Sequence, residues 1–142
     1  RTMFEERIEK AAELFKSGFN CSQSIVLAFA DMYGFTQEQA ARMAASFGGG
    51  IGRMRQTCGA ACGMFLLAGL ETGATDPKDR EGKGANYAVV QELAAVSEQL
   101  GQKLLADIPP EEVAAFEAIL KRLRKNAFQF IHQSQKEAAQ HE

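Results

Sequence analysis

The sequence predicts an all-α protein, a compact bundle of about five to six helices whose last helix is long and amphipathic. Ala, Glu, Gln, Leu and Lys dominate the periodic segments and favour helices, whereas Val, Ile and Thr, which favour strands, are scattered. Capping signals and glycines divide the apolar repeats into separate segments. With 142 residues, 46% of them hydrophobic and 24% charged, the chain has the composition of a single globular domain, residues 1–142.

Three helices are predicted in the N-terminal part. Residues 2–17 repeat apolar side chains on one face, as a helix packed against a core does. Asn20 with Gln23, and Thr36 with Gln39, match the capping box that marks a helix N-terminus, so they predict the starts of the second and third helices. A glycine follows each of the three segments and is expected to end it.

Three more helices are predicted after the glycine cluster. The fourth covers residues 57–72, and the polar, Gly- and Asp-Pro-containing stretch behind it predicts a loop that is long for a compact bundle. The fifth covers residues 86–107. The sixth starts at Pro110, which suits the first turn of a helix. Together these C-terminal helices are expected over residues 86–140.

The last predicted helix carries apolar residues alternately three and four apart, the spacing of a coiled-coil seam. These residues are Val113, Phe116, Leu120, Leu123, Ala127 and Phe130. We interpret the seam first as a surface that packs on the chain's own bundle, and the alternative is a homodimer formed through the last helix.

Composition argues against several functions. A net charge of -2 predicts no general attraction to nucleic acid or to anionic lipid, and the basic residues 121–125 read as a solvated helix face. The longest apolar run, residues 64–70, is too short to span a bilayer. No signal for secretion is visible at the start, and three cysteines, an odd number, argue against a disulfide-stapled scaffold. We therefore expect a cytoplasmic protein with reduced or functional thiols.

Two of the three cysteines stand where a helix is predicted to begin. Cys21 follows a capping residue, and Cys58 follows Thr57. Unpaired N–H groups and the positive end of the helix dipole stabilise a thiolate there, the dipole by about 0.3–1 kcal/mol. A larger effect on Cys58 requires Arg53 or Arg55 beside it.

Cys62 follows Cys58 by four residues, so the two lie one turn apart on one helical face. Their side chains run nearly parallel in an intact helix, which disfavours a disulfide between them, and a bridge from Cys21 to Cys58 across two packed helices is easier. Three roles stay open for the cysteines: buried small hydrophobes, reactive thiols or, least favoured, ligands of a metal ion or iron–sulfur cluster. The sequence requires no cofactor.

The segment GGGIGRMRQTCGAACG, residues 48–63, is the least ordinary part of the chain. Its glycines match neither a P-loop nor a dinucleotide fingerprint. They can form a sharp connection with left-handed backbone angles, which we favour, or a nest of N–H groups that binds an anion or cofactor. The residues expected to contact such a ligand are Gly48, Gly49, Gly50, Gly52, Arg53, Gly59 and Gly63.

In order along the chain, GFNCSQS, SFGGGIGR, TCGAACG and LAGLETG resemble the C_GCAxxG_C_C (CGAxxG) family of small, helical redox-active proteins. The resemblance covers residues 11–73. Cys21 matches the first family cysteine, and Cys58 matches the cysteine of CGAxxG, with Gly59 and Gly63 at the glycines of that motif. The resemblance implies redox chemistry at the cysteines.

The chain departs from the family pattern in its C-terminal half, where two further cysteines are expected. The comparable stretch reads LGQKLLAD, with Gly101 or Gln102 in place of a cysteine, and no cysteine follows. Cys62 stands at a small-residue position of the motif instead. A mechanism that needs four cysteines therefore does not transfer to this chain.

These observations lead to one hypothesis and one alternative. The hypothesis is a redox-active thiol protein, a candidate thiol oxidoreductase, that performs thiol–disulfide or electron-transfer chemistry with an unidentified partner. Cys58 would attack, Cys21 or Cys62 would resolve, and Arg53 with the glycine turn would supply positive potential. The alternative is a non-catalytic helical module that binds a cofactor or small anion at the glycine-rich turn, with structural cysteines.

Overall fold

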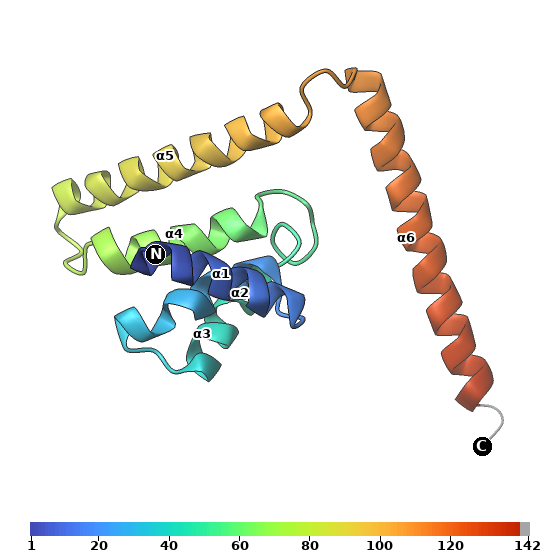
Figure 1. Cartoon of the computed structure of the whole chain (residues 1–142), viewed down its shortest axis with the longest axis horizontal. Helices are drawn as coiled ribbons and strands as arrows, with labels where there is room; N and C mark the ends of the chain where they lie inside the picture. The colour runs from blue at the N-terminus through green and yellow to red at the C-terminus, as the bar shows by residue number, and fades with distance from the viewer. Residues whose placement is uncertain (140–142) are drawn as a thin grey trace. The chain divides into compact units, whose positions relative to one another are not determined.

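The computed structural model describes residues 1–139, and all regular secondary structure in that range is helical (Figure 1). The predicted all-α fold is confirmed. Residues 140–142, the end of the expected domain and of the expected helical segment 86–140, lie outside the described range. In chain order the elements are α1 (Met3–Lys16), α2 (Cys21–Phe29), the 3₁₀ turn η1 (Ala30–Tyr33), α3 (Gln37–Ala44), the 3₁₀ turn η2 (Ala45–Phe47), α4 (Gly59–Thr72), α5 (Arg80–Leu104) and α6 (Pro110–Ala139).

Both capping boxes predicted from the sequence are confirmed. Asn20 Oδ1 accepts from the Gln23 N–H (2.9 Å), and Gln23 Oε1 accepts in return from the Asn20 N–H (3.1 Å). Thr36 and Gln39 make the same reciprocal pair at the start of α3. Each cap stabilises its helix by about 1 kcal/mol and sets the residue at which the helix begins. Cys21 is thereby fixed as the first residue of α2.

Helix α5 begins earlier than predicted, at Arg80 and not at residue 86. Asp79 Oδ1 accepts a hydrogen bond from the Gly82 N–H (2.8 Å), and the Asp79 carbonyl accepts from the Lys83 N–H (3.2 Å). Asp79 therefore caps the helix, and the glycines behind it are helical. The expected long loop is consequently short and covers residues 73–79.

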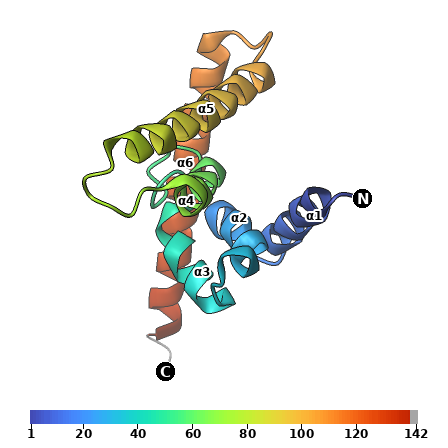
Figure 2. The ribbon, with the colours of Figure 1, turned by 90° about the vertical axis from the view of Figure 1, so that its left-hand side faces the viewer.

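The core is centred on α2, which packs against α1, α3 and α4 (Figure 2). Its largest fully buried side chains are Val26 and Leu27. The surrounding buried positions are small, because this core is built mainly from alanines that let the helices approach closely. The core cluster consists of Val26, Leu27, Ala30, Ala40 and Ala44, with Leu14, Phe35, Ala41 and Leu66 packed against it.

An ion pair ties α1 to η1, the 3₁₀ turn that follows α2. The two terminal nitrogens of Arg7 donate to the Asp31 carboxylate at 2.8 and 3.0 Å, and Arg7 Nη1 also donates to the Ala28 carbonyl at 2.6 Å. The guanidinium lies 5.4 Å from the centre of the Phe29 ring. Hydrogen bonding from Arg7 holds the pKa of Asp31 at about 2, below its ordinary value of 3.8.

The chain divides into two compact units, Arg1–Leu100 and Gly101–Glu142. The expected single domain stays a prediction. The second unit holds α6, whose seam residues Phe116, Leu120 and Leu123 are exposed. Homodimerisation through this seam also stays a prediction. Among the described residues, no helix has both the length and the apolar character needed to cross a bilayer.

Candidate functional site

The contact between α2 and α4 depends on two glycines one turn apart. A Cβ added at Gly63 would lie 2.9 Å from Ile25 Cβ and 3.0 Å from the Ser22 carbonyl oxygen, closer than side chains normally approach. A Cβ at Gly59 would lie 2.7 Å from the Phe47 carbonyl oxygen and would collide with Cys21 Sγ. The backbone of α2 therefore rests directly on α4. Both glycines, expected from the sequence to contact a ligand, are buried by this contact.

Three chain segments converge on Cys21. Its sulfur occupies the space that a side chain at Gly59 would fill, and Gly59 also touches Gly48, since a Cβ there would lie 3.5 Å from Gly48 Cα. Gly48 in turn leaves room for the Asn20 side chain, whose Nδ2 donates to the Ala45 carbonyl (3.0 Å). The glycines of the turn and of α4 therefore position Cys21 Sγ against the residue that follows Cys58.

The three cysteines differ in exposure, and none is paired in a disulfide. Cys58 is exposed, Cys21 is half-buried, and Cys62 is buried with 6% of its surface exposed. Cys58 was expected inside the first turn of the helix, capped by Thr57. The structure makes Cys58 itself the N-cap, because its backbone is not helical (ψ 128°) while its carbonyl accepts from the Cys62 N–H at 2.9 Å.

Burial raises the pKa of the Cys62 thiol, and negative charge on Cys58 and Cys21 raises it further. The influence of both neighbours means that the Cys62 sulfur lies within electrostatic reach of Cys58 and of Cys21. The Cys62 thiol donates a weak hydrogen bond to the Thr57 carbonyl, with sulfur and oxygen 4.0 Å apart. Cys62 is therefore held as a neutral thiol, while Cys58 meets solvent.

The glycine turn is a left-handed connection, as favoured from the sequence. Residues 49–53 all have φ between 58° and 75°, including the β-branched Ile51 at 60°. The N–H groups of residues 51–56 all donate to carbonyls of residues 46–51. Because these six N–H groups are used inside the turn, they do not form a nest for an anion. The ligand contacts expected at Gly48, Gly49, Gly50, Gly52 and Arg53 stay a prediction.

The arginines of the turn are exposed, and both adopt left-handed backbone angles. The Arg53 side chain lies close to Gly49, where an added Cβ would be 3.0 Å from Arg53 Cγ. In the part of the chain that the structure describes, no hydrogen bond or ion pair joins Arg53 or Arg55 to a cysteine sulfur. The positive potential expected from Arg53 beside Cys58 therefore stays a prediction.

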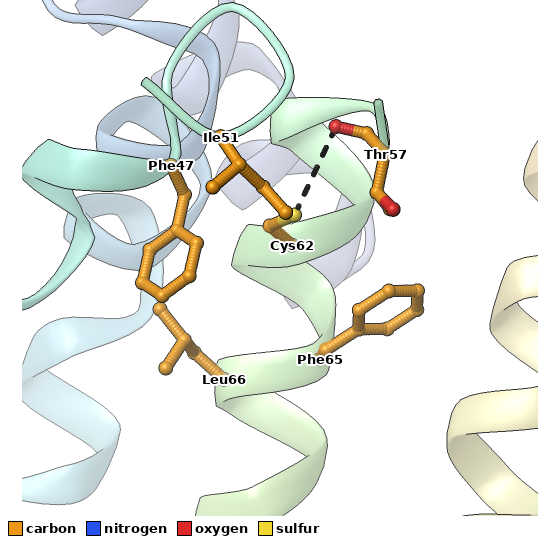
Figure 3. Close-up of a pocket in the computed structure, with 6 residues that line it drawn as sticks. All are labelled: Phe47, Ile51, Thr57, Cys62, Phe65 and Leu66. Atoms are coloured by element: carbon orange, nitrogen blue, oxygen red, sulfur yellow. Dashed lines mark hydrogen bonds between the residues drawn. The ribbon is translucent and has the colours of Figure 1, made fainter. Parts of the chain in front are cut away.

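A pocket of about 320 Å³ opens beside the cysteines (Figure 3). The Cys62 sulfur faces it, and Ile51 reaches from the glycine turn towards that sulfur. The lining residues are Phe47, Ile51, Thr57, Cys62, Phe65 and Leu66. Apart from Cys62, the sequence did not mark them as a site, because apolar residues at helical spacing ordinarily indicate core. One feature of the sequence could have indicated the pocket: Ile51, a β-branched residue, stands between glycines in a turn that needs left-handed backbone angles.

No group of three or more His, Cys, Asp or Glu side chains among the described residues is arranged to hold a metal ion. The three sulfurs gather at one end of α4 but differ in depth, from the exposed Cys58 to the buried Cys62. This arrangement gives a solvent-facing thiol with a second thiol on a neighbouring helix and a third behind it. Such an arrangement suits exchange between thiols and disulfides.

Comparison with known proteins identifies a family. A family model matches residues 19–108, a region that contains all three cysteines and runs through the whole of α5. The resemblance predicted for residues 11–73 is therefore confirmed from residue 19 onwards, and the match continues to residue 108. Neither the curated proteins nor the solved structures gave a match. Because the matched region is more than half of the chain, the protein belongs to the family described as putative redox-active protein (C_GCAxxG_C_C).

Proposed function

We propose that this protein performs thiol–disulfide exchange, with Cys58 as the attacking thiol and Cys21 as the resolving thiol. The observation that carries the proposal is the contact of Cys21 Sγ with Gly59, the residue directly after the exposed Cys58. A resolving thiol must reach the attacking sulfur without a large movement of the backbone. The glycines at positions 48 and 59 keep that approach open.

The exchange proceeds in two balanced steps. The Cys58 thiolate attacks one sulfur of a substrate disulfide, its S–S bond breaks, and one thiolate leaves while a mixed disulfide forms on Cys58. The Cys21 thiolate then attacks Cys58 Sγ, and the second substrate thiolate leaves. The substrate gains two electrons and binds the two protons that the cysteines give up. The protein is left with a Cys21–Cys58 disulfide, which an external dithiol reduces again.

Cys62 is less suited than Cys21 to resolve the mixed disulfide. Its raised pKa keeps it protonated at neutral pH, and the thiolate is the nucleophile in exchange. It also belongs to α4, the helix that Cys58 caps, so a bond between these two cysteines would not connect separate helices. Cys21 belongs to α2, so its bond to Cys58 would join two helices that already pack closely.

The test uses three single variants, Cys21→Ser, Cys58→Ser and Cys62→Ser, treated with 2-hydroxyethyl disulfide. Intact mass and peptide mapping then identify which bonds have formed. We expect the wild type and Cys62→Ser to lose two hydrogens and to yield a Cys21–Cys58 bridge. Cys21→Ser should stop at the mixed disulfide on Cys58, and Cys58→Ser should react slowest. A bridge between Cys58 and Cys62 in the wild type, or no bridge in any protein, would refute the assignment.

The pH dependence of alkylation gives a second test. In the Cys21→Ser variant, iodoacetamide should modify Cys58 before Cys62 at neutral pH. Modification of Cys62 should become fast only above the pH at which an ordinary thiol reacts, because its pKa is raised by burial and by neighbouring charge. Unfolding the same variant in urea should remove the difference. Equal rates in the folded protein would contradict the roles given to Cys58 and Cys62.

A further inference from the structure

The pocket adjoins the proposed reaction site along the chain. Thr57, one of its lining residues, immediately precedes Cys58, and Cys62, another lining residue, belongs to the first turn of α4. A group bonded to Cys58 is therefore attached one residue away from the pocket lining. The volume of about 320 Å³ lies at the small end of the range seen for ligand sites.

The lining of this pocket selects an apolar ligand. Phe47 and Leu66 stand on one side of the Cys62 sulfur and Phe65 on the other (Figure 3). Among the residues that the structure describes, none with a charged side chain lines it. The hydrogen bond of the Cys62 thiol is directed to the Thr57 carbonyl, so the thiol's one donor is already used within the wall. A charged group placed here would lose its hydration without gaining a partner.

Ile51 is a second, independent observation at the same place. A β-branched residue with a φ of 60° is strained, whereas its neighbours Gly50 and Gly52 adopt such angles without a side-chain penalty. The Ile51 side chain reaches into the pocket towards Cys62 (Figure 3). The turn therefore carries an apolar side chain at a backbone position that favours glycine, and this side chain forms a wall of the pocket.

We propose that this pocket binds an aromatic or branched aliphatic arm of the disulfide that Cys58 attacks. The inference rests on the proposed function and adds the class of substrate: a small disulfide with at least one neutral, apolar arm. Apolar burial of that arm holds its sulfur next to Cys58, and discrimination against charged disulfides follows from the uncharged lining.

The test compares methanethiosulfonates that transfer different groups with the same leaving group. Cys58 of the Cys21→Ser variant displaces methanesulfinate and keeps the transferred group as a mixed disulfide, so mass mapping confirms the site. For Cys58 we measure the rate with the benzyl reagent divided by the rate with the methyl reagent. This benzyl-to-methyl ratio is then compared with the same ratio for the free thiol N-acetylcysteine amide, which corrects for the intrinsic reactivity of each reagent. We expect a ratio raised on the order of tenfold. The negatively charged sulfonatoethyl reagent should show no such gain.

Variants of the lining separate the pocket from general reactivity. Phe65→Ala and Ile51→Gly should each return the benzyl-to-methyl rate ratio towards that of the free thiol. Ile51→Gly introduces a residue that adopts the left-handed backbone angle without strain, so this variant should fold and remains informative if Phe65→Ala does not fold. Leu67→Ala is the matched control, because Leu67 is a half-buried residue of α4 that does not line the pocket.

A binding measurement tests whether the pocket takes an apolar ligand when no thiol reaction is possible. In the Cys21→Ser/Cys58→Ser double variant, the neutral dye N-phenyl-1-naphthylamine should show saturable fluorescence that Phe65→Ala removes and Leu67→Ala leaves. If the dye binds but the rate ratio equals that of the free thiol, the pocket does not serve the disulfide and the inference is wrong. If the dye does not bind, it is also wrong, while a Cys21–Cys58 bridge would still support the proposed exchange.

Discussion

The two halves of the chain use apolar residues in opposite ways. Every buried residue among those described lies between Ala11 and Ala68, and most of them are Ala, Gly or Ser. Helix α5 has no buried residue, and the described large apolar residues of α6 are half-buried or exposed. The tightly packed part is therefore the part rich in small residues. Close approach of helix backbones, rather than bulk of side chains, produces the burial there.

This contrast explains where the cysteines are. Thiols are positioned to within an ångström only where backbones are in contact, and Gly59 and Gly63 bring α2 into contact with α4. The amphipathic helices α5 and α6 offer no comparable contact in the part of the chain that the structure describes. Helices with exposed apolar faces can shift relative to a neighbour at little cost, whereas helices locked through glycine cannot.

The largest expected difference between the halves is in the cost of shortening a leucine. Leu27 is 1% exposed in α2, and Leu123 is 59% exposed in α6. Leu27→Ala should lower the free energy of unfolding by about 2–5 kcal/mol, and Leu123→Ala should change it by no more than about 0.5 kcal/mol. Urea denaturation followed by circular dichroism measures both.

A large cost for Leu123→Ala would break the contrast. It would mean that the α6 seam is covered in solution, as homodimerisation through the last helix requires. Sedimentation velocity over a range of concentrations then decides whether a second copy is the cover. A monomer at every concentration would contradict homodimerisation through the α6 seam.

Glycine substitutions within α4 should show the next largest difference. Gly59→Ala should destabilise the protein by about 1–3 kcal/mol, because the new methyl group meets Cys21 Sγ and the Phe47 carbonyl. Gly69→Ala should stabilise it by about 0.5–1 kcal/mol, since nothing lies within 4 Å of an added Cβ there and alanine favours the helix. Thermal unfolding of both variants measures these changes. Equal changes in stability would show that close backbone contact at Gly59 does not stabilise the packed half.

The attachment of α5 is expected to depend on Asn86. Its Nδ2 donates to the Ala68 carbonyl (3.2 Å) and to Thr72 Oγ1 (2.9 Å), which joins α5 to α4. Asn86→Ala should lower the hydrogen-exchange protection of α5 by about 1 kcal/mol and leave that of α2 unchanged. Tyr87→Ala, at an exposed neighbouring position, is the control. Loss of protection in α2 as well would show that the two parts unfold together.

The smallest effect concerns the ion pair that holds α1 to the packed half. Because the folded pKa of Asp31 is about 2, below its ordinary 3.8, its contribution to stability is fully present above about pH 4. It is lost as the pH falls from there through 2. The difference in unfolding free energy between wild type and Asp31→Asn should shrink over that range. A difference independent of pH would contradict the pairing.

Local signals predicted the helices well where their chemistry is local. The capping boxes at Asn20 and Thr36 involve residues three apart, so the sequence alone contains both partners. The start of α5 was missed because Asp79 and the glycines behind it were read as a loop, although an aspartate is a good N-cap. Cys58 was predicted one position too far into its helix, because a cap is defined by backbone angles and the sequence does not reveal those angles.

The helical class, the caps and the cysteine and glycine motif could be predicted from local sequence, because each depends on neighbours along the chain. The contact of Cys21 with Gly59, the packing of α2 on the small face of α4 and the entry of Ile51 into a pocket beside Cys62 became visible only in the folded chain. Those contacts join residues far apart in the chain. Their physical basis is the close approach of backbones at glycines, which has no signature in local spacing.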